Sequence, residues 1–128
     1  MTKFSVSFNK FEKAVERLGE ALSARKTKMN RDSAILRFEL CYDLSWKTTK
    51  IFLDDNFGVK CFSPKSCWRE TFQGGIIEYD DIWFKMTDWR NNIVHTYSER
   101  LDDDLYEDLP VALEKFKGLQ KVLKKSFK

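Results

Sequence analysis

The fold is decided by the stretch Ile35-Leu36-Arg37-Phe38-Glu39-Leu40-Cys41-Tyr42-Asp43-Leu44-Ser45-Trp46. At 100° per residue, its apolar side chains and those that follow fall on two faces of one helix. The first face carries Ile35, Phe38, Tyr42, Trp46, Thr49 and Leu53, and the second carries Leu36, Leu40, Leu44 and Ile51. A helix that is apolar on two sides lies at the centre of its bundle or also meets another subunit.

One acidic residue, Glu39, falls within the first of these faces. A carboxylate buried there needs a cationic or hydrogen-bonding partner. Two interpretations stay open: Glu39 lies at the edge of the face and reaches water, or it pairs with Arg90.

Helical spacing also precedes this segment. A first amphipathic helix is predicted from apolar residues three or four positions apart, at Phe4, Phe8, Phe11, Val15, Leu18 and Leu22. The basic stretch 25–28 is the expected connection to the central helix. Asn30 or Asp32 can cap that helix, and Gly58 is placed to end it.

The second half of the chain predicts three further helices. Ser63-Pro64 is typical of a helix start, and Gly74-Gly75 stops this short third helix. Acidic residues at 78–81 favour the start of a fourth helix. A fifth follows Asp102-Asp103-Asp104, where Pro110 predicts a kink or a later start. The sequence therefore predicts an all-α fold, an up-and-down bundle of four longer helices with one additional short helix.

Size and composition set limits on the class of protein. With 128 residues, 42% of them hydrophobic, and a net charge of +3, the chain is expected to form one folded domain. It has no apolar run of roughly 20 residues and no apolar leader at its start, so we expect a cytoplasmic protein without a membrane segment. Cys41, Cys61 and Cys67 lack C-x-x-C spacing and are expected to be free, buried thiols. A single histidine and scattered cysteines predict neither a metal site nor a cofactor.

Basic residues gather in two places, at Arg25, Lys26, Lys28 and Arg31 and at Lys121, Lys124, Lys125 and Lys128. Such runs are more often solvated helix ends than nucleic-acid patches, and lysines near the end of a helix interact favourably with its dipole.

The candidate functional segment is Arg90-Asn91-Asn92-Ile93-Val94-His95-Thr96-Tyr97, which holds the only histidine. An arginine can bind a phosphate, a histidine can move a proton near neutral pH, and the tyrosine hydroxyl can accept a group. On a regular helix Arg90 and His95 would point about 140° apart. Two arrangements overcome this: the helix ends near Val94, or two copies of the segment meet across a symmetric dimer.

The spacing R-x4-H-x-Y of Arg90, His95 and Tyr97 resembles the motif of HEPN-domain proteins, in particular HepT-type toxins encoded beside an MNT-type nucleotidyltransferase. Three more segments agree with the branch called nucleotidyltransferase substrate-binding proteins: 38–47, Ser63-Pro64-Lys65, and Trp83-Phe84-Lys85-Met86 leading into Arg90-Asn91. The similarity runs from about Arg31 to the end of the chain. Trp89, directly before Arg90, departs from the acidic or small residue of many relatives and can reshape the cleft.

This resemblance implies one HEPN-like helical domain over residues 1–128 that forms a homodimer. It also implies a metal-independent endoribonuclease site in the dimer cleft, with Arg90 and His95 acting on RNA. Asn91 is placed to orient the imidazole or the RNA, with Glu39 in support. The MNT-type partner would transfer AMP from ATP to Tyr97 and so silence the toxin.

Two other functions remain open. In the first, the chain is a non-catalytic subunit that presents a nucleotide or substrate to the nucleotidyltransferase, and Arg90 and His95 only bind phosphate. In the second, it is a structural helical adaptor that tolerates alanine at both positions. Only the toxin hypothesis predicts RNA cleavage by the isolated chain.

Overall fold

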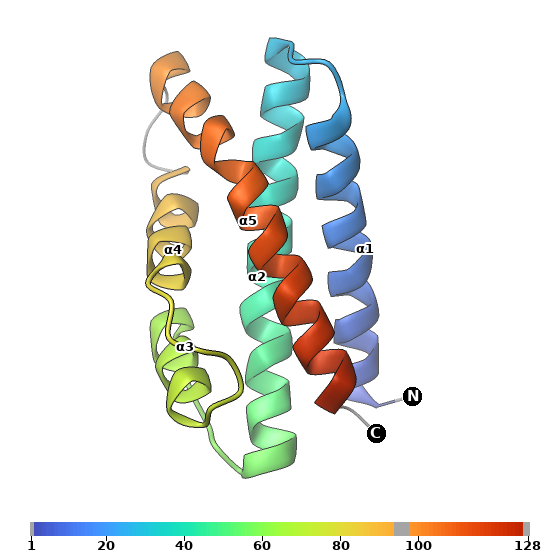
Figure 1. Ribbon diagram of the computed structural model, residues 1–128, viewed down its shortest axis with the longest axis vertical. Helices are drawn as coiled ribbons and strands as arrows, with labels where there is room; N and C mark the ends of the chain where they lie inside the picture. Colours follow the sequence, from blue (N-terminus) through green and yellow to red (C-terminus); the bar gives the residue numbers. More distant parts are fainter. Residues whose placement is uncertain (1, 94–97, 127–128) are drawn as a thin grey trace.

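The computed structural model describes residues 2–93 and 98–126, which form five α-helices (Figure 1). These are α1 (Lys3–Ser23), α2 (Lys28–Phe57), α3 (Pro64–Gln73), α4 (Ile82–Ile93) and α5 (Glu99–Ser126). The long α2 contacts all four other helices. α1 runs along one side of it, α3 and α4 follow one another along the other side, and α5 crosses diagonally (Figure 1). The predicted all-α fold is confirmed, and none of the described helices is long and apolar enough to cross a membrane.

The ends of α2 follow from its capping residues. Thr27 has an extended backbone, and its hydroxyl accepts a hydrogen bond from the N–H of Asn30 at 3.0 Å. The prediction that Asn30 or Asp32 caps this helix is therefore wrong by one turn. The side-chain Nδ2 of Asn30 instead donates to the carbonyl of Arg25 at 2.6 Å. At the other end Gly58, with φ 65°, ends α2 as predicted.

The core is rich in aromatic rings. Phe38 of α2 and Phe116 of α5 are fully buried, with their ring centroids 6.1 Å apart, and Trp68 lies 4.4 Å from Trp83. The first apolar face of α2 supplies much of this core. On the second face, however, Leu36 and Leu40 remain about half exposed, so one side of α2 is left uncovered by the other described helices.

A buried arginine holds the start of α5 against the start of α2. Arg31 is 3% exposed, and its Nη1 donates to Glu99 at 2.9 Å and to Asp103 at 3.2 Å. These bonds, with one from Arg31 to Asp32, raise the pKa of the guanidinium. Arg31 is thus part of a carboxylate network rather than a solvated helix end. Of the two outcomes predicted from Pro110, a kink or a later start, the later start is wrong, because α5 begins at Glu99 and runs through Pro110.

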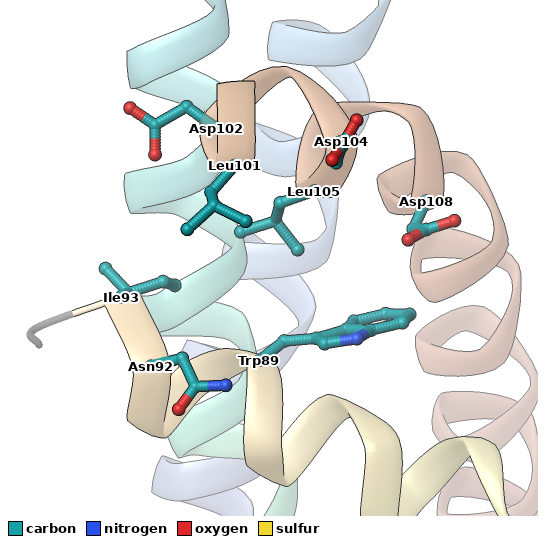
Figure 2. Close-up of a pocket in the computed structure, with 8 residues that line it drawn as sticks. All are labelled: Trp89, Asn92, Ile93, Leu101, Asp102, Asp104, Leu105 and Asp108. Atoms are coloured by element: carbon teal, nitrogen blue, oxygen red, sulfur yellow. The ribbon is translucent and has the colours of Figure 1, made fainter. Parts of the chain in front are cut away.

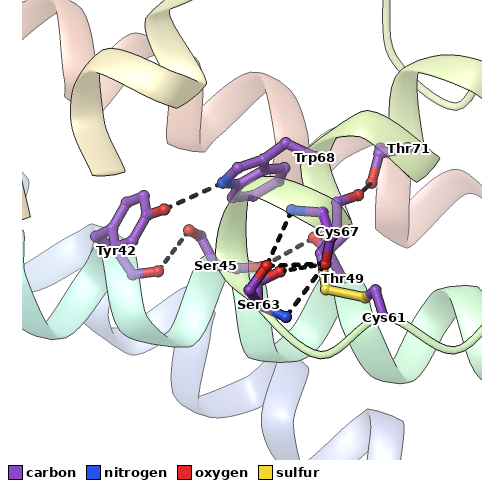
Figure 3. The surroundings of a disulfide bond; sticks show 9 residues. Tyr42, Ser45, Thr49, Cys61, Ser63, Cys67, Trp68 and Thr71 are labelled. Atoms are coloured by element: carbon purple, nitrogen blue, oxygen red, sulfur yellow. Dashed lines mark hydrogen bonds between the residues drawn. A yellow bond between two sulfur atoms is a disulfide. The ribbon is translucent and has the colours of Figure 1, made fainter. Parts of the chain in front are cut away.

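Two cysteines differ from expectation, because Cys61 and Cys67 form a disulfide (Figure 3). Cys61 lies in the short connection after α2, and Cys67 lies in the first turn of α3, with their Cα atoms 5.2 Å apart. Ser63 between them caps α3 by accepting from the N–H of Ser66, as predicted. The prediction of three free thiols holds only for Cys41, which is buried.

Candidate functional site

Arg90 is the residue of the predicted site whose side-chain contacts define the described part of that site. It lies in the last turn of α4 and faces two carboxylates of α2. Its Nε donates to Oδ1 of Asp43 at 3.0 Å, and its Nη2 donates to Oδ2 of the same residue at 3.2 Å. Oε2 of Glu39 lies 3.5 Å from Nη2. Glu39 therefore pairs with Arg90, one of the two arrangements expected from the sequence.

The principal partner, Asp43, was not singled out from the sequence. Its signal was available, because Asp43 follows Glu39 by four residues and so lies on the same side of the helix. Hydrogen bonds to Asp43 raise the pKa of Arg90 against the opposing effect of burial, and Glu39 adds a further raising effect. The three side chains are only 23% to 29% exposed, so they form a partly enclosed cluster at the surface.

The contact with Asp43 uses one edge of the guanidinium. Arginine has five N–H donors, and Asp43 uses two of them on the edge formed by Nε and Nη2. The Nη1 end belongs to a different edge of the same planar group. Asp43 therefore fixes the plane of Arg90 through the edge formed by Nε and Nη2, and Glu39 lies beside the same Nη2.

A buried chain of hydrogen bonds holds α4 in place beneath Arg90. Trp68 Nε1 donates to the Tyr42 hydroxyl oxygen at 3.1 Å, and the Thr87 hydroxyl donates to the Trp83 carbonyl at 2.8 Å. Tyr42 and Thr87 are hydrogen-bonded to each other. Because each hydroxyl has one hydrogen, Tyr42 must be the donor to Thr87. This network joins α2, α3 and α4, and burial raises the pKa of Tyr42.

His95 and Tyr97 lie outside the described residues, so their predicted roles stay predictions. Asn91 is exposed, one residue after Arg90. α4 is described as far as Ile93. The two arrangements expected to bring Arg90 and His95 together, an end of the helix near Val94 or a symmetric dimer, therefore stay predictions.

A cavity of about 250 Å³ lies between the end of α4 and the start of α5 (Figure 2). The indole of Trp89 forms one wall and faces Leu105, and Asp104 and Asp108 lie on the α5 side. The Trp89 ring also packs on Phe38, at 6.2 Å between centroids. The residue before Arg90 thus lines a cavity between α4 and α5, and its predicted effect on the cleft stays a prediction.

Metal ligands do not gather in the part of the chain that the structure describes: no three His, Cys, Asp or Glu side chains there are placed to hold an ion. The chemistry of the described site is instead that of one guanidinium and two carboxylates.

Comparison with known proteins agrees with this fold. The chain is similar to the protein in the crystal structure of ttk003001694 from Thermus thermophilus, with 27% sequence identity and a TM-score of 0.76. The likeness covers 90% of this chain and 96% of the other. No curated protein matches the sequence. The family model described as "Nucleotidyltransferase substrate binding protein like" matches residues 2–125. The chain therefore belongs to the nucleotidyltransferase substrate-binding protein-like family, which has the HEPN-like fold.

Proposed function

We propose that this chain is a HepT-like toxin, a metal-independent endoribonuclease that a partner nucleotidyltransferase silences. One observation carries the proposal: Asp43 orients a partly exposed Arg90 through Nε and Nη2, so Nη1 takes no part in that pair. His95 and Tyr97 follow Arg90 within seven residues, in the spacing of HepT-type toxins. The family name, which refers to nucleotidyltransferases, supports a partner of that kind.

The reaction needs no metal ion, since RNA carries its own nucleophile. Histidine side chains ordinarily titrate near neutral pH, and His95 removes the proton of a 2′-hydroxyl. The 2′-oxygen attacks the adjacent phosphorus, the bond to the 5′-oxygen breaks, and a protonated imidazole returns a proton to that oxygen. Arg90 stabilises the charge that builds on the phosphate oxygens, and Asn91 orients the imidazole or the RNA. The products are a 2′,3′-cyclic phosphate and a 5′-hydroxyl.

A homodimer is part of the proposal, with the uncovered face of α2 as its interface. Leu36 and Leu40, 53% and 46% exposed, each precede a carboxylate of the Arg90 cluster by three residues. A dimer on this face would bury both leucines and bring two clusters together. Light scattering tests it: Leu36→Glu with Leu40→Glu should give monomers, whereas Val111→Glu, at an equally exposed site on α5, should not.

The regulatory step is a transfer of AMP to Tyr97. The phenolic oxygen attacks the α-phosphorus of ATP on the partner enzyme, pyrophosphate leaves, and the phenol loses its proton. The added phosphate would compete with RNA for Arg90 and block access to it. Intact mass after incubation with partner and ATP should show an AMP increment in wild type and none in Tyr97→Phe.

RNA cleavage in EDTA by the purified chain is the decisive experiment. Wild type should cleave and arrest growth on expression, and His95→Ala and Arg90→Ala should do neither. If both variants cleaved RNA as fast as the wild type, the assignment of nuclease activity to Arg90 and His95 would be wrong. The partner with ATP should protect RNA from wild type but not from Tyr97→Phe.

The second candidate is a non-catalytic substrate-binding subunit of a nucleotidyltransferase. The family name favours it. This function predicts no cleavage by the isolated chain. It predicts instead that the partner enzyme transfers nucleotides to its substrate only when this chain is present.

A further inference from the structure

A second surface, further along α2 from Arg90, gathers basic side chains from three separate parts of the sequence. It is a hollow of about 510 Å³ lined by Lys3 of α1, Lys47 and Lys50 of α2, and Lys60 and Phe62 of the connection to α3. These five residues are called the basic groove below. Asp54 and Asp55 also line it, and Asp54 forms an ion pair with Lys60 at 3.1 Å. Positive charge still exceeds negative charge in the groove.

Phe62 is the unusual member of this set, because its side chain is 83% exposed. Both of its neighbours are anchored: Cys61 is buried in the disulfide with Cys67, and Ser63 caps α3. The connection therefore presents the ring on a fixed support. Burial of a phenylalanine is favourable, so packing within this chain does not explain the position of Phe62.

Cationic and aromatic groups are interleaved in the groove. The Lys50 ammonium lies 5.7 Å from the centroid of the Phe62 ring and 6.0 Å from that of Trp46. The combination of phosphate-binding cations with an open aromatic face is typical of surfaces that hold single-stranded nucleic acid. A base can stack on the ring only where it is not already stacked in a duplex.

We propose that the basic groove binds single-stranded RNA, with its lysines on the phosphates and an unpaired base stacked on Phe62. The groove also has a fixed relation to the candidate site. Lys47 follows Asp43 by one turn of α2, about 6 Å along the axis. An RNA strand bound by Lys47 and Lys50 would therefore lie next to the face of α2 that contacts Arg90. That the groove feeds RNA to Arg90 rests on the proposed function, whereas RNA binding in the groove does not.

Fluorescence anisotropy with a labelled oligouridine of about 12 nucleotides tests the lysines. The protein carries His95→Ala throughout, so that the probe stays intact. Lys47→Glu with Lys50→Glu should weaken binding at least tenfold and reduce the slope of log K against log salt by about 1.4, since each phosphate contact contributes about 0.7. The matched control is Lys121→Glu with Lys125→Glu on α5, which changes the charge equally and should leave the affinity within about twofold. Equal weakening by both pairs would show attraction by overall charge and overturn the proposal.

Substitutions of Phe62 test the stacking. Phe62→Leu keeps an apolar side chain without a ring and should weaken binding about five- to tenfold, whereas Phe62→Trp should preserve it. The same probe annealed to its complement should bind more weakly than the single strand. Unchanged affinity in Phe62→Leu, a preference for the duplex, or binding of anionic vesicles without binding of RNA would each overturn the proposal.

The two proposals fail separately. If the wild type cleaves RNA and the groove variants bind and cleave normally, the groove proposal is wrong and the nuclease stands. If binding of the single-stranded probe depends on Lys47, Lys50 and Phe62 but the wild type cleaves no RNA, the groove proposal stands and the nuclease proposal is wrong.

Discussion

Asp43 and Arg90 connect α2 to α4 through two parallel hydrogen bonds on one edge of the guanidinium, at 3.0 and 3.2 Å. Charge-assisted pairs of this form fix direction as well as distance. Asp43 is therefore a positioning residue in the proposed reaction: it does not touch RNA, but it determines where the remaining N–H groups of Arg90 point.

Asp43→Asn should lower the single-turnover cleavage rate about tenfold with little change in RNA affinity. An amide can accept only on its oxygen, so one of the two bonds to Arg90 is lost and the guanidinium is free to turn. The unfolding free energy in urea should fall by only about 1 kcal/mol, because the pair is partly exposed. Asp88→Asn is the control, since it removes an equal charge from the more exposed pair with Lys65. Cleavage by Asp43→Asn at the wild-type rate would show that Asp43 has no positioning role.

Tyr42→Phe should destabilise the protein by about 1–3 kcal/mol. The substitution leaves the buried Trp68 N–H without its acceptor and removes the donor to Thr87. Urea unfolding measures the effect, and Tyr79→Phe, at a tyrosine that is 70% exposed, should change little. Equal stabilities of wild type and Tyr42→Phe would mean that the hydrogen-bonded chain beneath Arg90 contributes nothing.

Local patterns in the sequence predicted the helices well. The helical spacing of Phe4, Phe8 and Phe11 identified a buried face of α1, and the Ser63-Pro64 and Gly58 signals located two helix ends. Each of these signals acts within a turn or two of the chain, so no knowledge of the rest of the fold is needed.

Features that depend on distant residues were missed. The early start of α5 is held by Arg31, 68 residues before its partner Glu99. Asp43 meets Arg90 only once α2 and α4 pack together. The Cys61–Cys67 disulfide is a different case, because its cysteines are only six residues apart; it depends on the turn after α2 and the first turn of α3, which hold the two Cα atoms 5.2 Å apart. Spacing places Asp43 on the same side of α2 as Glu39, but it does not specify which residues of α4 and α5 meet α2 in the folded chain.

Reduction of the Cys61–Cys67 bond should lower the unfolding free energy by about 2 kcal/mol, because the bond restricts a short loop of the unfolded chain. Urea unfolding with and without dithiothreitol measures this difference. Cys41→Ala should remain sensitive to the reductant, and Cys61→Ala with Cys67→Ala should lose that sensitivity. Titration of three free thiols in the unreduced, denatured protein would contradict the disulfide.

Asp80 should make stability depend on acidity. Hydrogen bonding to Lys115, at 2.7 Å, lowers the pKa of Asp80 below its ordinary value. A lowered pKa in the folded state adds stability that is present above the ordinary pKa, near 3.9, and is lost as the pH falls through the lowered value. We expect the stability difference between wild type and Asp80→Asn to be below about 1 kcal/mol at neutral pH and to shrink below about pH 4.

Asparagine can still accept the hydrogen bond that Asp80 receives from the N–H of Ile82, so this comparison isolates the charge. In a Lys115→Met background, the difference in unfolding free energy between Asp80 and Asp80→Asn should lose most of its dependence on pH. A difference that stays constant from about pH 7 to about pH 2.5 would show that the ion pair contributes no linkage.

Gly58→Ala and Gly118→Ala should change stability in opposite directions, although neither new methyl group would meet another atom within 4 Å. Gly58 has a φ of 65°, where an L-residue costs about 1 kcal/mol, so its replacement should destabilise the end of α2. Gly118 lies within α5, where alanine should stabilise the protein by about 0.5–1 kcal/mol. Urea unfolding of the two variants separates the backbone effect from any effect of added volume. If both variants moved in the same direction, the left-handed backbone at Gly58 would not be what ends α2, and the connection that carries Phe62 would need another anchor.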